Sequence, residues 1–261
     1  MTVKKILLIF LLILFLVPQG FAQELGEFEE SFNKEQETKN EEPEETQVSE
    51  NDDSDSAFGQ VLFKFIGKLF WYTLIAGGAY SYERMQPEYS SFSYPRVAAE
   101  PLIAILRSDT SFQIINQELF ALDQRFELGY GPFGASGRYS YYFETDSPSE
   151  LHYWQAHFLY RMSILNLIEF SPGIGGFGMF GQYKNEGLSL TAPIRLNIER
   201  TVSLEILPVL NIYPNGATGS DLDIALLFDF QQLKPRIGFR RLTSSGGTSL
   251  QGFYTGVSYV Y

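Results

Sequence analysis

Two histidines are the only imidazole groups in this chain of 261 residues. His152 and His157 lie in a segment of alternating polar and apolar residues, and because they are five positions apart they face opposite sides of an extended strand. Ser147 and Ser149 come shortly before His152, so a serine nucleophile with a histidine base is one hypothesis for this region. His152 is therefore the candidate catalytic residue, and the alternative is an ordinary polar residue beside a loop.

Other residue types that could carry chemistry are missing or wrongly arranged. The chain has no cysteine, which excludes disulfides, thiolate nucleophiles and zinc-thiolate sites. Two histidines at this spacing make no metal site, so we expect no metal. The glycine-rich stretch 173–178 looks like a phosphate-binding loop but lacks the lysine and the strand-to-helix context. Such glycines also allow tight bends and close strand approach, and we expect no cofactor.

Acidic residues are concentrated in one short part of the chain. The formal charge is −12, from 19 Lys and Arg against 31 Asp and Glu. Residues 23–56 hold 14 of these acidic residues and 2 of the basic ones, whereas residues 57–261 hold 17 and 15. A chain without excess positive charge does not suit the phosphates of nucleic acid, so we exclude a nucleic-acid partner.

The first 22 residues have the pattern of a secretory signal peptide. Lys4 and Lys5 precede an unbroken apolar run over 6–17, and small residues near Ala22 form a cleavage site. The apolar run would span about 18 Å as a helix, well short of a hydrocarbon core of about 30 Å. The sequence therefore predicts cleavage after Ala22 and a mature chain that acts outside the cytoplasm.

Two segments of contrasting composition follow. Residues 23–56 contain too few apolar residues to offset the entropy of ordering them, so we expect a disordered acidic linker. Apolar residues recur at helical spacing over 57–72, which predicts an amphipathic helix within a segment 57–97. Lys64 and Lys68 make this helix a poor membrane span. It would lie on a membrane surface or cover the end of the domain that follows, and both alternatives stay open.

Beyond about residue 98 the apolar period changes to two. In 188–198, for example, Leu, Ala and Ile alternate with Ser, Thr, Pro, Arg and Asn, which is typical of strands with one apolar and one mixed face. Longer loops are expected at about 145–150, 181–187, 213–221 and 242–249, and shorter turns near 131–135, 162–166, 199–202 and 231–235. Outer-membrane barrels typically have short turns at one end and longer loops at the other. Counting these segments over 98–261 predicts about ten strands, with eight or twelve as alternatives.

The last strand carries a more specific signal. Residues 254–261 read Tyr-Thr-Gly-Val-Ser-Tyr-Val-Tyr, and this resembles the C-terminal assembly signal of bacterial outer-membrane β-barrel proteins. Gly256, Tyr259 and Tyr261 match that pattern, whereas Tyr254 stands where a polar residue is commoner and the final residue is Tyr instead of Phe. The resemblance implies a closed antiparallel barrel in the outer membrane of a double-membraned, Gram-negative bacterium. It also implies that the barrel-assembly machinery is a partner during biogenesis.

The alternation then assigns the two faces of the barrel. Aromatic and aliphatic residues would face lipid, and the charged face would line the lumen. The predicted lumen charge network contains Arg138, Arg161, Glu169, Arg195, Glu205, Asp223, Asp229, Arg236 and Arg240, with Arg125, Glu127, Glu144 and Glu199 on the same face. Nearly balanced charges in a narrow lumen favour mutual pairing, so we expect a network with a structural role. A narrow conduit is the alternative.

These observations combine into one expected organisation. The chain would be an all-β protein, a closed antiparallel transmembrane β-barrel over 98–261 in the outer membrane, with residues 23–97 in the periplasm. We expect a structural or binding role in the cell envelope, with outer-membrane lipid as a partner and a periplasmic partner possible for the acidic linker. Three alternatives stay open: an outer-membrane lipid-modifying hydrolase using His152, a narrow channel, and a secreted β-sandwich that buries the same apolar faces.

Overall fold

The computed structural model describes residues 25–31, 104–164, 167–199, 201–230, 232–244 and 246–261. The predicted signal peptide, most of the acidic linker and the whole predicted helical segment 57–97 lie outside these residues, as does the side chain of Glu199.

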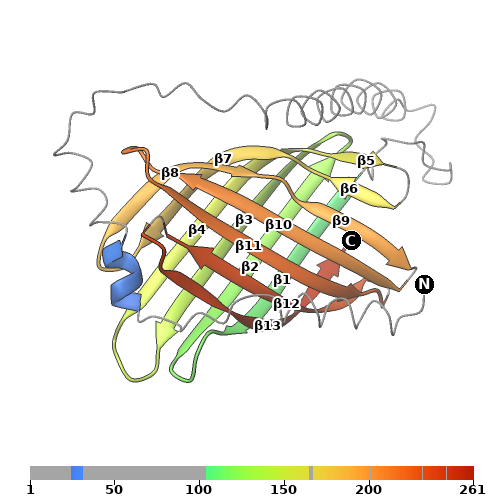
Figure 1. Cartoon of the computed structure of the whole chain (residues 1–261). Helices are drawn as coiled ribbons and strands as arrows, with labels where there is room; N and C mark the ends of the chain where they lie inside the picture. Colours follow the sequence, from blue (N-terminus) through green and yellow to red (C-terminus); the bar gives the residue numbers. More distant parts are fainter. Residues whose placement is uncertain (1–24, 32–103, 165–166, 200, 231, 245) are drawn as a thin grey trace, which may run out of the picture.

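Antiparallel strands make up nearly all of the described C-terminal part (Figure 1). The strands are β1 (Ala104–Ile114), β2 (Leu119–Tyr130), β3 (Phe133–Glu144), β4 (Glu150–Tyr160), β5 (Met162–Ile164), β6 (Ile168–Phe170), β7 (Gly173–Phe180), β8 (Lys184–Thr191), β9 (Ile194–Glu199), β10 (Val202–Ile212), β11 (Thr218–Phe228), β12 (Leu233–Thr243) and β13 (Ser249–Val260).

The sheet closes on itself. Three of the barrel strands are each divided into two segments by a short break. β4 and β5 form one such strand, β6 and β7 the second, and β8 and β9 the third, so the thirteen segments make ten barrel strands. Proline stands at two of these breaks, Pro172 and Pro193, where its missing N–H interrupts the ladder. β1 pairs with β13 and β10 pairs with β11, which leaves no open edge around the ring. The predicted closed antiparallel barrel of about ten strands is confirmed.

The two ends of the barrel differ in their connections. At one end, here called the turn side, β2 and β3 are joined by two residues, of which Gly131 has a positive φ of 57°. β1 begins and β13 ends on this side. At the other end, the loop side, longer connections over 115–118, 145–149, 213–217 and 244–248 join the strands. The predicted longer loops are present at 145–149, 213–217 and 244–248, but the loop expected over 181–187 is wrong, because only residues 181–183 separate β7 from β8.

Neighbouring residues along a strand point to opposite faces. Arg125 is 7% exposed and points inward, whereas Phe126 next to it is 53% exposed and points outward. The same alternation runs along β1, β4 and β10. The outward set includes Leu106, Leu122, Leu128, Phe133, Tyr139, Phe158, Ile174, Leu188, Leu210, Phe253 and Val257. The barrel thus has an apolar outer surface around a largely polar interior. Among the described residues, no helix has the length and apolar character needed to cross a membrane.

A short helix occupies residues 25–31, within the segment expected to be disordered. Its apolar residues Leu25 and Phe28 are three positions apart, share one face, and are buried in the loop-side mouth of the barrel. The expectation of disorder counted apolar residues along the chain, and it missed that two of them on one helical turn fit an apolar recess elsewhere in the protein. Figure 1 shows this helix in blue at the end of the barrel opposite the C-terminus.

Candidate functional site

Glu205 is the centre of an ion-pair cluster in the turn-side half of the interior. Arg107 donates to both of its carboxylate oxygens, at 2.6 and 2.7 Å, and Arg125 donates to it at 3.0 Å. A third arginine, Arg195, donates at 3.2 Å. Glu205 and Arg107 are almost completely buried, and β2 lies across the ring from β10, so these pairs bridge opposite walls.

Three aspartates form a second cluster nearer the loop side. Arg138 pairs with Asp123 and also reaches Asp223 on the far wall, at 2.8 Å. Arg240 donates to both oxygens of Asp221, at 2.9 and 2.7 Å, and to Asp123 at 3.1 Å. β3 and β11 lie opposite each other in the ring, so this cluster also crosses the lumen.

Arg236 joins the two clusters. It donates to Asp109 at 2.7 Å and to the Tyr254 hydroxyl at 2.6 Å. That hydroxyl donates in turn to Asp223 at 2.5 Å, and Arg107 donates to Asp109 at 2.6 Å. The result is a continuous network from the turn side toward the loop side. Buried charges need such reciprocal pairing, because each one loses its hydration on folding.

The residues expected in the lumen network lie in the central network, beside it in a pair with Arg195, or toward the turn side. Arg138, Glu205, Asp223, Arg236 and Arg240 are in the central network, and Arg195 joins it to Glu169 at 3.5 Å.

Two further residues of the expected set lie toward the turn side. Asp229 forms a pair with Lys234 there, away from the two clusters. Arg161 donates to the Gly131 carbonyl and packs against Gly129 and Gly134, where a side chain would collide with it.

Four central charges were not anticipated: Arg107, Asp109, Asp123 and Asp221. The inward parity of β1 and β2 could have identified the first three, because each alternates with an exposed apolar or small residue. With them the two clusters and Arg236 contain six arginines and five carboxylates, and Arg195 pairs in addition with Glu169.

Little free space remains in this interior. Two cavities of about 30 Å³ each lie beside Arg125, Glu127 and Pro193, one toward Arg195 and one toward His157. A cavity of this size holds about one water molecule. These two cavities therefore offer room for isolated water molecules.

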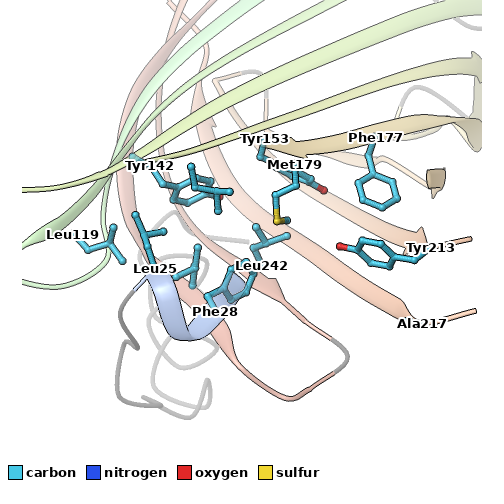
Figure 2. Packing of buried hydrophobic residues seen from close by; sticks show 13 residues of the cluster. Leu25, Phe28, Leu119, Tyr142, Tyr153, Phe177, Met179, Tyr213, Ala217 and Leu242 are labelled. Carbon is cyan, nitrogen blue, oxygen red and sulfur yellow. The ribbon is translucent and has the colours of Figure 1, made fainter. Parts of the chain in front are cut away.

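The loop-side mouth has an apolar lining in place of the charges. Figure 2 shows Leu25 and Phe28 of the short helix pointing into a recess formed by side chains from strands all around the ring. The recess, here called the cup, consists of Leu119, Ala121, Tyr142, Leu151, Tyr153, Phe177, Met179, Tyr213, Ala217, Leu242 and Leu250. Phe28 is fully buried there, so the helix closes this end of the barrel.

Polar contacts at the rim of the cup fix the helix in position. The backbone N–H of Leu25 donates to Glu144 at 2.8 Å, and the carboxylate of Glu29 accepts the backbone N–H of Gln182 at 2.8 Å. Ser31 lies 2.6 Å from the hydroxyl of Ser244. Burial raises the pKa of Glu29 above its ordinary value, and the hydrogen bonds from the 182–183 backbone oppose this rise.

His152 lies on the outer surface near the loop side. Its Nδ1 is 2.6 Å from the Tyr139 hydroxyl, and its ring stacks on Tyr141 with centroids 5.0 Å apart. Ser147 and Ser149 hydrogen-bond to each other at 2.8 Å, whereas the hydrogen bond of His152 is to Tyr139. These aromatic rings and His152 line an open hollow of about 500 Å³.

The second histidine faces the interior. His157 Nε2 is 2.8 Å from the Ser189 hydroxyl, which donates to Asn211. The two histidines thus lie on opposite faces. Within the described ranges no group of three or more His, Asp or Glu side chains is placed to hold a metal ion.

The residues of the assembly-signal resemblance divide between the two faces. Tyr259 and Tyr261 point outward and are 41% and 79% exposed, whereas Tyr254 points inward and joins the network. A side chain at Gly256 would come within 2.4 Å of the Thr110 carbonyl oxygen on β1. Glycine at this position therefore permits the close approach of the strands that close the barrel.

Comparisons with known proteins add a limited finding. No protein-family model and no curated protein sequence matches the chain. Among solved structures it is similar to "KdgM porin in complex with disordered oligogalacturonate", with 9% identity and a TM-score of 0.34. That alignment covers 60% of this chain and 97% of the porin chain. A likeness of this extent carries no argument about function or ligand.

Proposed function

We propose that the protein is a small outer-membrane β-barrel with a structural or binding role and a filled, non-conducting interior. The observation that carries this proposal is the inverted distribution of residues in a closed barrel. Large apolar side chains cover the outside, and paired charges occupy the inside. A soluble barrel or sandwich would bury its apolar faces, whereas hydrocarbon solvates the outer face seen here.

Aromatic residues near both ends of the barrel favour a membrane setting. On the loop side, Phe112, Phe120 and Phe143 form a chain of contacts with centroids 5.7 and 5.9 Å apart. On the turn side, Phe133 contacts Phe158 and Tyr160 at 5.9 and 6.0 Å. Two aromatic girdles around an aliphatic band are typical of outer-membrane barrels. The signal peptide and the C-terminal assembly pattern support the same location.

The two alternative functions receive less support. A channel needs a continuous passage, but ion pairs such as Arg138 to Asp223 cross the lumen. A lipid hydrolase needs a nucleophile beside His152, and that imidazole instead contacts the phenol of Tyr139. We therefore infer that the interior serves stability and that any binding takes place at the mouth or outer surface.

Single-cysteine labelling tests the membrane assignment, because the chain has no cysteine of its own. Phe126→Cys places a thiol on the outer face and Ser258→Cys places one inside, where Ser258 is fully buried. In bacterial envelopes we expect a lipid-soluble maleimide to label the Phe126→Cys variant and to leave the Ser258→Cys variant unlabelled until denaturation. Equal labelling of Phe126→Cys by a charged, lipid-insoluble maleimide would contradict the proposal.

A further inference from the structure

Three polar residues face outward near the middle of the barrel wall that β1 and β2 form. The Thr110 hydroxyl donates to the side-chain oxygen of Gln124 at 2.6 Å, and the Gln124 amide donates to the Ser108 hydroxyl at 2.9 Å. Thr110 is exposed, whereas Ser108 and Gln124 are half-buried. These three residues are here called the polar triad. Near the middle of β11 and β12 the exposed outward residues are instead Leu222 and Ile237.

The polar triad lies deep in the band that would contact hydrocarbon under the proposed function. Gln124 is the sixth of twelve residues in β2, and Thr110 is the seventh of eleven in β1. At a rise of about 3.4 Å per residue and a tilt of about 40°, both lie roughly 10 Å or more from the strand ends. Lipid headgroups stay at the level of the aromatic girdles near those ends. The lipid around the polar triad therefore offers it only hydrocarbon.

The Gln124 amide has hydrogen-bonding capacity that the polar triad does not use. A primary amide has two N–H donors and an oxygen with two lone pairs, and Gln124 uses one donor and one acceptor position within the polar triad. The amide can be reached from outside, because Thr110 and Gln124 line the open hollow of about 500 Å³ beside Tyr139. A polar group without a partner is expensive in hydrocarbon. The unused N–H and lone pair therefore favour a partner that both donates and accepts.

A second copy of this chain is such a partner. Two copies inserted in the same direction are related by a two-fold axis along the membrane normal, so a residue at the axis meets its own equivalent at the same depth. A primary amide is complementary to itself, because its N–H donates to the oxygen of the other amide and its oxygen accepts in return.

We propose that the protein forms a dimer in the membrane, in which the walls of β1 and β2 face each other and the two Gln124 amides pair across the axis. The proposal rests on the proposed function, because only hydrocarbon makes the unused groups of Gln124 costly. It gives the outer surface of the barrel a binding role, with a second copy as the partner.

Cysteine crosslinking of the full chain in proteoliposomes tests this dimer, because the chain has no cysteine of its own. Thr110→Cys places a thiol beside Gln124 and keeps the amide. Leu222→Cys is the matched control, since Leu222 is exposed near the middle of β11, which lies opposite β3. We expect an oxidant to convert at least about tenfold more of the Thr110→Cys variant to a disulfide-linked dimer. Equal conversion of the two variants, or no crosslink in either, would overturn the dimer.

Dilution with lipid distinguishes a stable dimer from chance collisions. Crosslinks that form by collision decrease in proportion to the density of protein in the membrane, whereas crosslinks within a dimer do not. We expect the crosslinked fraction of Thr110→Cys to stay within about a factor of two when the lipid per protein is raised about tenfold. A decrease in proportion to the dilution would contradict a stable dimer.

Gln124→Leu tests whether the amide holds the two copies together. The substitution places an apolar side chain on the lipid-facing wall, so the barrel should keep its difference in electrophoretic mobility between boiled and unboiled samples. Combined with Thr110→Cys, it should lower the crosslinked fraction several-fold, because the hydrogen bonds between the copies are lost. An unchanged crosslinked fraction would overturn the pairing of the amides.

Flotation of the proteoliposomes separates this proposal from the proposed function. Protein that fails to float with the lipid contradicts membrane insertion, and the dimer with it. Protein that floats, keeps its heat-dependent mobility and shows no more crosslinking at Thr110→Cys than at Leu222→Cys contradicts the dimer alone.

Discussion

The two halves of the barrel interior are built from different side chains and depend on their neighbours in different ways. In the turn-side half, Glu205 is held by arginines from several walls, so that removing one group leaves others unpaired. In the loop-side half, Phe28 fills an apolar cup and contributes by its volume. Removing one charged group from the network leaves a buried charge without a partner. Apolar packing in the cup depends on the volume and shape of the side chains that fill it. The two halves of the interior are therefore stabilised by different interactions, ion pairs in the network and apolar packing in the cup.

The largest expected effect is in the network. Glu205→Ala leaves Arg107, Arg125 and Arg195 without their shared carboxylate, and breaking a buried pair costs about 3–5 kcal/mol. We expect a much lower temperature for the electrophoretic shift of the folded barrel in unboiled samples. The control is Glu186→Ala, which removes an exposed partner of Lys184 and should change little. Equal shifts in the two variants would show that the central network does not stabilise the barrel.

Phe28→Ala affects the other half of the interior and should leave the barrel intact. Loss of a fully buried phenylalanine costs about 3–5 kcal/mol, which exceeds what a helix of seven residues can recover from other contacts. The Ser31 and Ser244 hydroxyl oxygens are 2.6 Å apart, so a Ser31→Cys and Ser244→Cys double variant should form a disulfide crosslink in detergent. We expect Phe28→Ala to abolish this crosslink while the heat-shift temperature stays constant. A parallel fall in that temperature would mean that the two halves are coupled.

Tyr254→Phe tests the link between the two charge clusters. The variant keeps the ring but removes a hydroxyl that donates to Asp223 and accepts from Arg236. An unsatisfied buried partner costs about 1–3 kcal/mol, so the heat-shift temperature should fall less than in Glu205→Ala. Tyr213→Phe, in the cup, is the matched control. A larger fall of the heat-shift temperature in Tyr213→Phe than in Tyr254→Phe would contradict the claim that the charge network contributes more to stability than the cup does.

The smallest effect concerns pH and belongs to the cup. Burial raises the pKa of Glu29, so the docked helix holds the proton more tightly than the free one. Docking in detergent should thus be strongest below the ordinary carboxyl pKa of 4.5 and weaken as the pH rises through the raised pKa. Crosslinking yield of the Ser31→Cys and Ser244→Cys variant measures this, and adding Glu29→Gln should remove the dependence. A dependence that persists in the Glu29→Gln variant would show that Glu29 is not the group responsible.

The outer face and the strand count could be predicted because both follow from local repetition. Period-two alternation of residue types matches burial in β1 and β4, because neighbouring residues along a strand face the interior and the outside in turn. Turn residues between these segments then mark where one strand ends and the next begins. No long-range information was needed for either conclusion.

The cup and the pairing scheme could not be predicted, because both depend on contacts between distant residues. Asp123 and Arg240 are far apart in sequence, and only the closed ring brings them to 3.1 Å. Leu25 and Phe28 look isolated in an acidic segment, and their burial depends on a recess formed mainly by strand residues from around the loop side. His152 similarly attracted attention through nearby serines that the loop directs toward each other.

The measurement that tests the central claim most directly is envelope fractionation followed by electrophoresis of boiled and unboiled samples. A closed barrel with an apolar outer face should be recovered with the outer membrane and should migrate differently before and after boiling. Recovery in the soluble periplasmic fraction, with the same mobility in both samples, would contradict the membrane-spanning barrel and with it the proposed function.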